Sequence, residues 1–444
     1  MNAIRGAQTN DGSKGSAIAL FRSKAVKEGP FHDSDSLSDY LICGWKMKSC
    51  VSPYNVLGRG TGWPEEVILC DVTMRDGEQT PGVAFSVEEK IELAGRLDQA
   101  GVPQIQVGLP GRSKAARVEA EKICRVKLGA KKELMTRGAY EGWREDVLAA
   151  IDCGAEIVHS YFPMSPYIRG MDSSLSNPEM IRRACQVVAF MKEKGVRAIN
   201  ISLLDATRTE EKFLFQMVKE VTEMGIHRIR LADTVGTASP EGIRYLFQKL
   251  GETIRPVKDP PIVGLHCHND FGLALANVFA GVRAGATLID VSVNGLGERS
   301  GNPALAEVAA GLEVLYGVKT HIQLDGLYGL SKFVEKISGI PISFNKPLVG
   351  EYAFADESDG HVTAQLREPF AFQGIQPESV GNRRKFVLGK NSGNNILRWK
   401  FRELNLEIRD ERYPLILDRI RELSEKRKGT LLSDEELKEI VKTM

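Results

Sequence analysis

The chain has 444 residues, of which 42% are hydrophobic and 26% charged, and its formal net charge is +1. This length and balance are typical of a globular protein with one large and one smaller domain, and the small net charge argues against a nucleic-acid or membrane partner. No apolar run approaches the roughly 20 residues of a membrane helix, and the N-terminus lacks the apolar core of a signal peptide.

The first part of the chain carries little periodic signal. Residues 1–65 are rich in Gly, Ser and polar residues, which predicts a partly ordered N-terminal extension. Residues 1–27 hold a single acid, Asp11, as organelle transit peptides often do. Acidic residues follow at once in EGPFHDSDSLSDY, which disfavours that interpretation. The seven cysteines are scattered without a C-x-x-C pair, so we expect reduced thiols and a cytoplasmic location.

From residue 66 onward, short apolar runs alternate with amphipathic stretches, which predicts strands alternating with helices. The first helix has the clearest signal: Ser86 and Glu89 form a capping box, Leu93 and Leu97 lie on its apolar face, and Gly101 suits its end. The eight strand-like runs are VILCDVT (67–73), IQVGLP (105–110), LMTRGA (134–139), IVHSYFP (157–163), AINISLLD (198–205), RIRLAD (228–233), IVGLHCH (262–268) and LIDVSVN (288–294).

Eight strand-helix units in succession predict a closed (β/α)₈ TIM barrel over residues 66–340. A doubly wound sheet is the alternative, and it would normally be shorter. In a (β/α)₈ barrel the chemistry lies at the carboxyl ends of the strands. Groups able to bind a metal or a substrate are therefore expected among the residues that follow each strand.

His266 and His268 end the seventh run and lie two residues apart, so in a strand both imidazoles face the same side. Neutral imidazole is the commonest metal ligand, although two polar residues at a strand terminus would explain the pattern equally well. Asp76 follows the first strand and Asn302 follows the eighth. Strands one, seven and eight lie side by side when the barrel closes, so a carboxylate, two imidazoles and an amide can converge on one divalent cation, Mg²⁺, Mn²⁺, Co²⁺ or Zn²⁺.

Three separated segments carry a family resemblance. DVTMRDGEQTPGVAFS (71–86), GLHCHNDFGLALAN (264–277) and NGLGERSGNPALAEV (294–308) resemble the signatures of the homocitrate synthase and 2-isopropylmalate synthase family, and the homocitrate synthases more closely. Beyond the barrel, FADESDGHVTA (354–364) and VGNRRKFVLGKNSGNNIL (380–397) resemble the linker and small C-terminal subdomain of that family. Residues 341–444 are thus expected to form a linker and an α-rich subdomain with a charged helical tail.

The resemblance implies a metal-dependent Claisen condensation of an acyl-CoA with a 2-oxo acid, that is, an acyltransferase with acetyl-CoA as co-substrate. It assigns the metal to Asp76, His266 and His268, with Asn302 close by. It also implies a homodimer, in which the linker of one subunit reaches the active site of the other.

The same resemblance assigns the remaining site residues. Arg75 and Gln79 lie where the family holds the 2-oxo acid, and Arg75 also stabilises the alkoxide that develops. Thr234 matches the threonine that binds the substrate carboxylate, and His159 matches another position in the substrate pocket. His361 matches the catalytic histidine of the linker.

Three positions depart from the family pattern. Gln106 replaces a glutamate at the end of the second strand, Leu204 replaces a glutamate near the fifth, and Phe372 replaces a tyrosine after His361. Two proton-handling groups, a Glu and a Tyr, are therefore absent. This leaves two alternatives to the synthase: an aldolase or lyase on the same barrel that does not use acyl-CoA, and a non-catalytic, metabolite-sensing paralogue. Retention of the complete metal set argues against the second.

Overall fold

Eight parallel strands form one closed barrel in the order β1 to β8, and β1 pairs with β8 (Ile68↔Leu288). The computed structural model describes residues 49–58, 60–171 and 174–444, so most of the expected N-terminal extension lies outside the described residues. The strands are β1 Ile68–Asp71, β2 Gln104–Gly108, β3 Lys131–Arg137, β4 Ile157–Pro163, β5 Ile199–Leu204, β6 Arg228–Asp233, β7 Ile262–Cys267 and β8 Leu288–Val291. The (β/α)₈ barrel is confirmed, and pairing of the first strand with the last excludes a doubly wound sheet.

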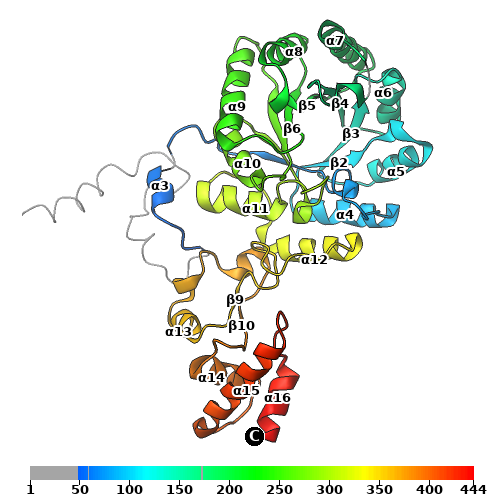
Figure 1. Cartoon of the computed structure of the whole chain (residues 1–444). Coiled ribbons are helices and arrows are strands. Elements are labelled where there is room, and N and C mark those ends of the chain that lie inside the picture. Colours follow the sequence, from blue (N-terminus) through cyan, green and yellow to red (C-terminus); the bar gives the residue numbers. More distant parts are fainter. Residues whose placement is uncertain (1–48, 59, 172–173) are drawn as a thin grey trace, which may run out of the picture.

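Helices surround the strands on the outside of the barrel (Figure 1). They are α4 Val87–Gln99, α5 Lys114–Cys124, α6 Trp143–Asp152, α7 Asn177–Glu193, α8 Glu211–Glu223, α9 Pro240–Ile254, α10 Ala274–Arg283 and α11 Leu305–Ala310. The capping box predicted at Ser86 is present, with Glu89 bonded back to the N-cap residue. Leu93 and Leu97 are fully buried between α4 and the strands, and burial of each such side chain contributes about 1.5–3 kcal/mol.

A second, smaller hydrophobic core lies in the C-terminal part of the chain (Figure 1). Helix α12, Leu327–Ser338, leads into a two-stranded parallel sheet of β9, Ala355–Asp356, and β10, Lys385–Phe386. The helices of this region are α13 Asp359–Arg367, α14 Asn394–Glu403, α15 Tyr413–Lys426 and α16 Asp434–Thr443. Val362 of α13 packs into this core, so the segment that carries His361 is held by the C-terminal helices.

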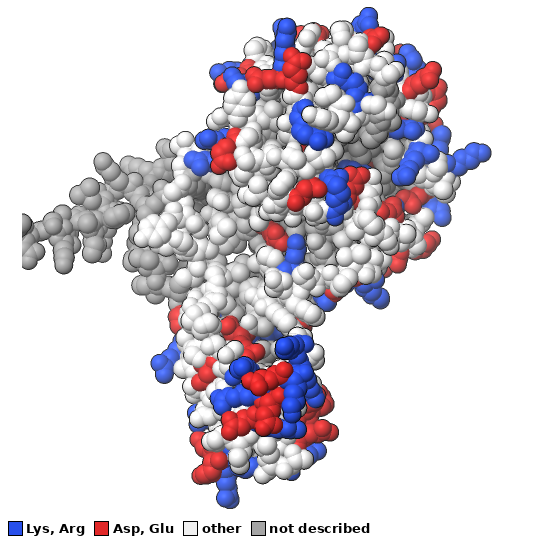
Figure 2. Space-filling view, in the orientation of Figure 1, with Lys and Arg blue, Asp and Glu red and all other residues white. Residues whose placement is uncertain are grey.

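The surface of these C-terminal helices carries both signs of charge, intermixed (Figure 2). Cross-element ion pairs join α14 to its neighbours, for example Arg398 to Asp410 and Lys400 to Asp434, both at 2.8 Å. The predicted charged tail is thus folded into helices α15 and α16. Among the described residues, no helix is both long and apolar enough to cross a membrane.

Five of the described cysteines are free: Cys70, Cys124, Cys153, Cys185 and Cys267. Cys50 is disulfide-bonded. The prediction of reduced thiols therefore holds for the five cysteines that lie within the barrel and its helices, and is wrong for Cys50.

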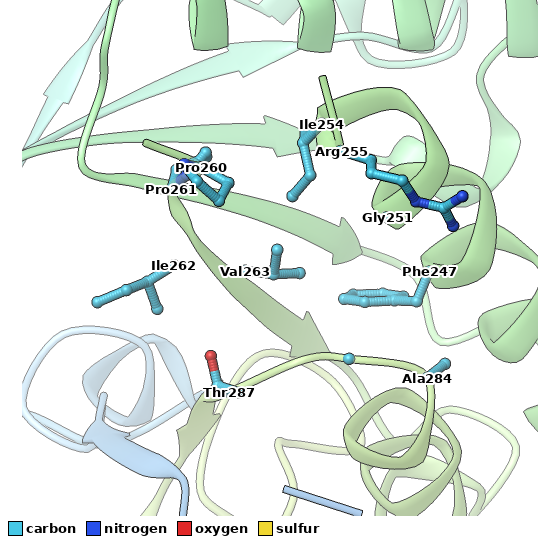
Figure 3. A pocket seen from close by; sticks show the side chains of 11 residues that line it. Phe247, Gly251, Ile254, Arg255, Pro260, Pro261, Ile262, Val263, Ala284 and Thr287 are labelled. Carbon is cyan, nitrogen blue, oxygen red and sulfur yellow. The ribbon is translucent and has the colours of Figure 1, made fainter. Parts of the chain in front are cut away.

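One pocket opens on the face of the barrel where the strands begin (Figure 3). It lies between the C-terminal end of α9, at Ile254 and Arg255, and the start of β7, at Ile262 and Val263. The residues expected to bind metal and substrate follow the carboxyl ends of the strands, so this pocket belongs to the opposite face and contributes none of them.

Candidate active site and metal centre

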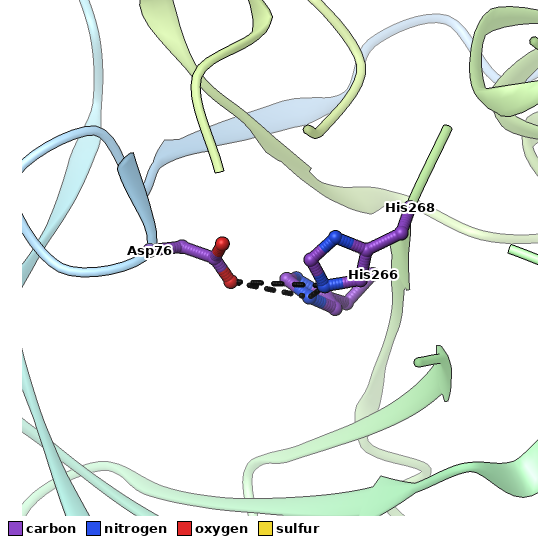
Figure 4. A group of neighbouring side chains, drawn as sticks. All are labelled: Asp76, His266 and His268. Atoms are coloured by element: carbon purple, nitrogen blue, oxygen red, sulfur yellow. Dashed lines mark hydrogen bonds and ion pairs between the residues drawn. The ribbon is translucent and has the colours of Figure 1, made fainter. Parts of the chain in front are cut away.

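Asp76, His266 and His268 come together at the carboxyl ends of β1 and β7 (Figure 4). The two imidazole Nε2 atoms lie 3.2 Å apart. One carboxylate oxygen of Asp76, Oδ2, lies 3.6 Å from Nε2 of His266 and 3.9 Å from Nε2 of His268. All three residues are buried, so three ligand atoms face one small space from which bulk water is excluded.

The protonation states of these three groups suit a divalent cation. Nδ1 of His266 lies 2.9 Å from Oδ2 of Asp290, and because a carboxylate only accepts, Nδ1 carries the hydrogen and Nε2 keeps its lone pair. Burial, with His266 adding to it, lowers the pKa of His268 to about 4, so that ring is neutral. Burial alone would raise the pKa of Asp76, but the positive charge of the adjacent Arg75 opposes burial and helps to hold the pKa well below its usual range.

Asn302 borders the same space from the loop after β8. Its Nδ2 donates to Oδ1 of Asp76 at 3.1 Å and to the carbonyl of Leu296 at 3.0 Å. Its side-chain oxygen is buried without a hydrogen-bond partner among the described residues, which is the condition expected of a group that awaits a ligand or water. A Cβ atom on Gly297 would lie 2.2 Å from Nδ2 of Asn302, so only glycine allows this loop to approach Asp76.

One carboxylate, two imidazole nitrogens and a nearby amide oxygen therefore fit the mixed oxygen and nitrogen set that divalent metals accept. The predicted convergence of strands one, seven and eight is present, because β1 pairs with β8 and β8 pairs with β7.

Arg75 lies beside the proposed metal position. Its Nη1 donates to Oδ2 of Asp76 at 2.8 Å and to Gln79 at 3.3 Å, and its Nε donates to Oε1 of Gln106. Gln79 in turn donates to Glu298 at 3.0 Å. Arg75 is thus held in place by one carboxylate and two amides, with part of its guanidinium still exposed. A fixed cation next to a metal suits the binding of an anionic oxygen.

His159 occupies the barrel interior and is 1% exposed. Its Nδ1 lies 2.9 Å from Oε1 of Glu133 and 3.1 Å from both the Gln106 amide and an Arg230 amine. Its Nε2 is buried without a partner among the described residues. Burial lowers the pKa of His159 despite the opposing charge of Glu133. The histidine predicted in the substrate pocket, His159, is therefore anchored by Glu133. The side chain of Gln106 lies between His159 and Arg75 and contacts both.

Glu133, Arg230 and Asp290 were not identified from the sequence, although they hold the site together. Arg230 donates to Oε1 of Glu133 at 3.0 Å and lies 3.1 Å from Asp290. Asp290 supports the metal-site histidine His266, and Glu133 contacts His159. One feature of the sequence could have indicated them: each is a charged residue within a run expected to form a buried strand. Charged residues are almost never fully buried unless they are paired, so three such residues imply that they contact one another or another charged group.

The ends of β5 and β6 are tied together at Thr234. Its hydroxyl accepts from the backbone N–H of Asp205 at 2.8 Å. Asp205 has a positive φ of 56° and pairs with Arg208, so the loop after Leu204 is held in a conformation that few non-glycine residues adopt. Thr234 is thus placed at the carboxyl ends of the strands, and its contact with a substrate carboxylate stays a prediction.

His361 lies apart from these residues. It is on α13, which is below the ring of strands in Figure 1. Its ring stacks on Phe372 with centroids 3.9 Å apart, and its Nδ1 lies 3.2 Å from Oδ1 of Asp356. Within a single chain, His361 therefore belongs to the C-terminal part and has no described contact with the metal cluster.

Comparison with known proteins identifies the family. Residues 66–334 match the HMGL-like family, and residues 348–428 match the homocitrate synthase post-HMGL domain-like family. The chain is 39% identical over 382 residues to a 2-isopropylmalate synthase of Methanocaldococcus jannaschii, covering 85% of this chain and 71% of the relative. It is 40% identical over 381 residues to the homocitrate synthase AksA of Methanopyrus kandleri, covering 86% and 93%.

The chain belongs to the homocitrate synthase and 2-isopropylmalate synthase family. The barrel is also similar to a hydroxymethylglutaryl-CoA lyase of Pseudomonas aeruginosa, with a TM-score of 0.55 and 22% identity over 64% of this chain and 96% of the lyase. This likeness supports the fold alone.

The structure supplies a physical reason why this chain has Gln106 where the family pattern has a glutamate. Nε2 of Gln106 lies 2.5 Å from Oε1 of Glu133. A glutamate there would bring two carboxylates into contact, and two carboxylates that share a site cannot both ionise at neutral pH. The amide avoids this repulsion and still accepts from Arg75. The amide at position 106 is thus compatible with the charged carboxylate of Glu133.

We predict that His266→Ala weakens binding of a divalent metal at least about 100-fold, because loss of a supporting outer group alone typically costs about 10- to 100-fold. Calorimetric titration with Mn²⁺ measures the affinity, and far-UV circular dichroism should show an intact barrel. The matched control is His321→Ala, since His321 is exposed and pairs with Glu66 outside the barrel interior. Equal metal affinity of the two variants would contradict the assignment.

We also predict that Gln106→Glu destabilises the protein by about 1–3 kcal/mol, because the new carboxylate would lie against that of Glu133 and the contact with Arg75 offsets the repulsion only in part. Adding Glu133→Gln should recover part of the loss, because the amide and carboxylate then exchange places. Urea unfolding of the wild type, both single variants and the double variant gives the coupling free energy, which we expect to exceed about 1 kcal/mol. Additive losses would show that the two side chains are independent.

Proposed function

We propose that the chain catalyses a metal-dependent condensation of an acyl-CoA, acetyl-CoA in the first instance, with a 2-oxo acid. The products are a 2-hydroxy-dicarboxylate or tricarboxylate and free CoA. The observation that carries this proposal is the buried cluster of Asp76, His266 and His268 beside Arg75, at the strand ends of a barrel whose relatives are named as synthases.

Asp76, His266 and His268, with Asn302 nearby, would hold one divalent cation from the set Mg²⁺, Mn²⁺, Zn²⁺ and Co²⁺. When bound, such a cation polarises the keto group of the 2-oxo acid as a Lewis acid. Asp290 keeps the lone pair of His266 directed into the site, because it accepts the hydrogen of Nδ1. The surrounding burial excludes water and strengthens each electrostatic contact.

The other polar groups would position and stabilise the substrate. Arg75 and Gln79 would hold the 2-oxo acid, and Thr234 would bind its carboxylate. His159 would complete the pocket from the barrel interior. During carbon-carbon bond formation the keto oxygen becomes an alkoxide, and the guanidinium of Arg75 is a fixed donor beside the position where that charge develops.

His361 would transfer the proton from the methyl group of the acyl-CoA. Because His361 lies on α13, outside the barrel of its own chain, we propose a homodimer in which it serves the active site of the second copy. We also propose a cytoplasmic location, on the basis of the free cysteines of the barrel.

A second candidate function is an aldolase or lyase that does not use acyl-CoA. It is favoured by Leu204, at the C-terminal end of β5, and by Phe372, whose ring carries no hydroxyl and stacks on His361. Release of free thiol from acetyl-CoA, measured with a panel of 2-oxo acids, separates the two. Thiol release that depends on the oxo acid and is lost on chelation supports the synthase, and its absence across the panel contradicts it.

We predict that Leu204→Glu combined with Phe372→Tyr does not increase kcat/KM with acceptors resembling oxaloacetate or 2-oxoglutarate. Loss of a positioned acid or base typically reduces rates about 10²- to 10⁴-fold, so a weakened ordinary synthase would improve. In a site adapted to another acceptor, desolvation of the new carboxylate opposes any gain. A tenfold or greater increase, on the order of 1.4 kcal/mol, would show that the enzyme is such a weakened synthase.

We predict that two inactive variants restore activity when mixed. His361→Ala lacks the linker group and His266→Ala lacks a metal ligand, so a mixed dimer retains one complete site if His361 acts across the interface. After subunit exchange, equal mixing should recover about one quarter of wild-type activity, because half of random dimers are mixed and each has one intact site of two. No recovery, with sedimentation showing mixed dimers, would place His361 in its own subunit's site.

A further inference from the structure

The segment around His361 contains an acid in contact with that histidine. Oδ1 of Asp356 lies 3.2 Å from Nδ1 of the imidazole. A carboxylate accepts hydrogen bonds and does not donate them, so the contact places the hydrogen on Nδ1 and leaves the lone pair on Nε2. The side chain of His361 is 46% exposed, and Nε2 is therefore the ring nitrogen that can reach another molecule.

Asp356 is itself held rigidly. Its backbone belongs to β9, where it pairs with Phe386 of β10, and its carbonyl accepts from the N–H of Val387 at 3.0 Å. Its second carboxylate oxygen, Oδ2, accepts from Nε2 of Gln365 at 2.5 Å. Gln365 is 1% exposed and follows His361 by one helical turn on α13. The strand and the helix thus fix both ends of the hydrogen-bonded pair.

The third contact restrains the plane of the ring. Phe372 stacks on His361 with an interplanar angle of 18°, and Phe372 is half exposed. Asp356 sets the rotation of the imidazole, and Phe372 covers one face of it. With 46% of the His361 side chain exposed, the ring remains accessible to another molecule. Since Phe372 has no hydroxyl, no second proton-handling group accompanies the histidine at this position.

We propose that Asp356 is the positioning residue for His361, holding it as the Nδ1–H tautomer so that Nε2 alone accepts the substrate proton. The proposal rests on the proposed function, in which His361 acts on the acyl-CoA. Nε2 takes a proton from the methyl carbon, the electron pair of that C–H bond forms the enolate double bond, and the negative charge passes to the thioester oxygen. The imidazolium that results donates Nδ1–H to Asp356, which stays ionised.

The tautomer can be measured without any assay of activity. Two-bond ¹H–¹⁵N correlation spectra of protein labelled in its histidines distinguish Nδ1–H from Nε2–H rings, and the signals of His361 are assigned by their loss in His361→Ala. We expect the Nδ1–H form in the wild type and a shift to the Nε2–H form in Asp356→Ala. A wild-type His361 in the Nε2–H form would overturn the proposal.

The kinetic test uses Asp356→Asn, which keeps the shape and removes the charge. We expect kcat to fall about 100-fold, while KM for both substrates changes by less than about twofold, because Asp356 would touch neither substrate. The matched control is Glu357→Gln, the neighbouring acid, whose carboxylate binds Asn391. We expect Asp356→Glu, which retains a carboxylate, to keep more activity than the Asn variant.

The experiments distinguish failure of the proposed synthase function from failure of the positioning role of Asp356. If no 2-oxo acid releases thiol from acetyl-CoA, the proposed function fails, and the tautomer measurement alone decides whether Asp356 positions His361. Two results in an active wild-type enzyme would contradict the positioning role and leave the synthase function intact. One is an equal fall in kcat for Asp356→Asn and Glu357→Gln. The other is a higher KM with an unchanged kcat for Asp356→Asn.

Discussion

The guanidinium of Arg230 between Glu133 and Asp290 is the contact on which the interior of this barrel depends. All three side chains are at most 1% exposed. Two carboxylates without a cation would repel each other in a medium where charges are poorly screened. Glu133 keeps its negative charge in spite of burial because Arg230 and His159 lower its pKa well below its usual range. Two histidines of the proposed active site depend on this arrangement, since Glu133 contacts His159 and Asp290 contacts His266.

A second pair of opposite charges lies at the carboxyl ends of the strands. Arg75 pairs with Asp76, so the proposed metal ligand and the proposed substrate-binding cation neutralise each other before either meets a ligand. A cation bound by Asp76 would weaken that pair and leave the guanidinium free to bind an anion. The site would then accept a metal and a carboxylate together more readily than either alone, which is the behaviour expected of coupled sites of opposite charge.

Each of the three positions that depart from the family pattern lies at or beside a residue with a defined contact. Gln106 matches Glu133, because the amide avoids a clash of carboxylates. Phe372 stacks on His361 and leaves that histidine with Asp356 as its polar partner. Leu204 precedes Asp205, whose backbone is held by Thr234 and whose carboxylate pairs with Arg208. These contacts are typical of a site adapted to its own substrate, in which changed residues remain packed and paired.

The sequence by itself determined the eight strands, the helix start at Ser86 and the proposed metal ligands Asp76, His266 and His268. These depend on local periodicity, a local capping pattern and short motifs whose spacing is visible along the chain. Only the tertiary structure decided that Glu133, Arg230 and Asp290 meet, since they come from three strands separated by many residues and each alone looks like a charge misplaced in an apolar run. The same holds for Asp356, His361 and Phe372. Their separation in sequence is small, but which of the nearby acids contacts the imidazole depends on the pairing of β9 with β10, and that pairing is a property of the folded chain.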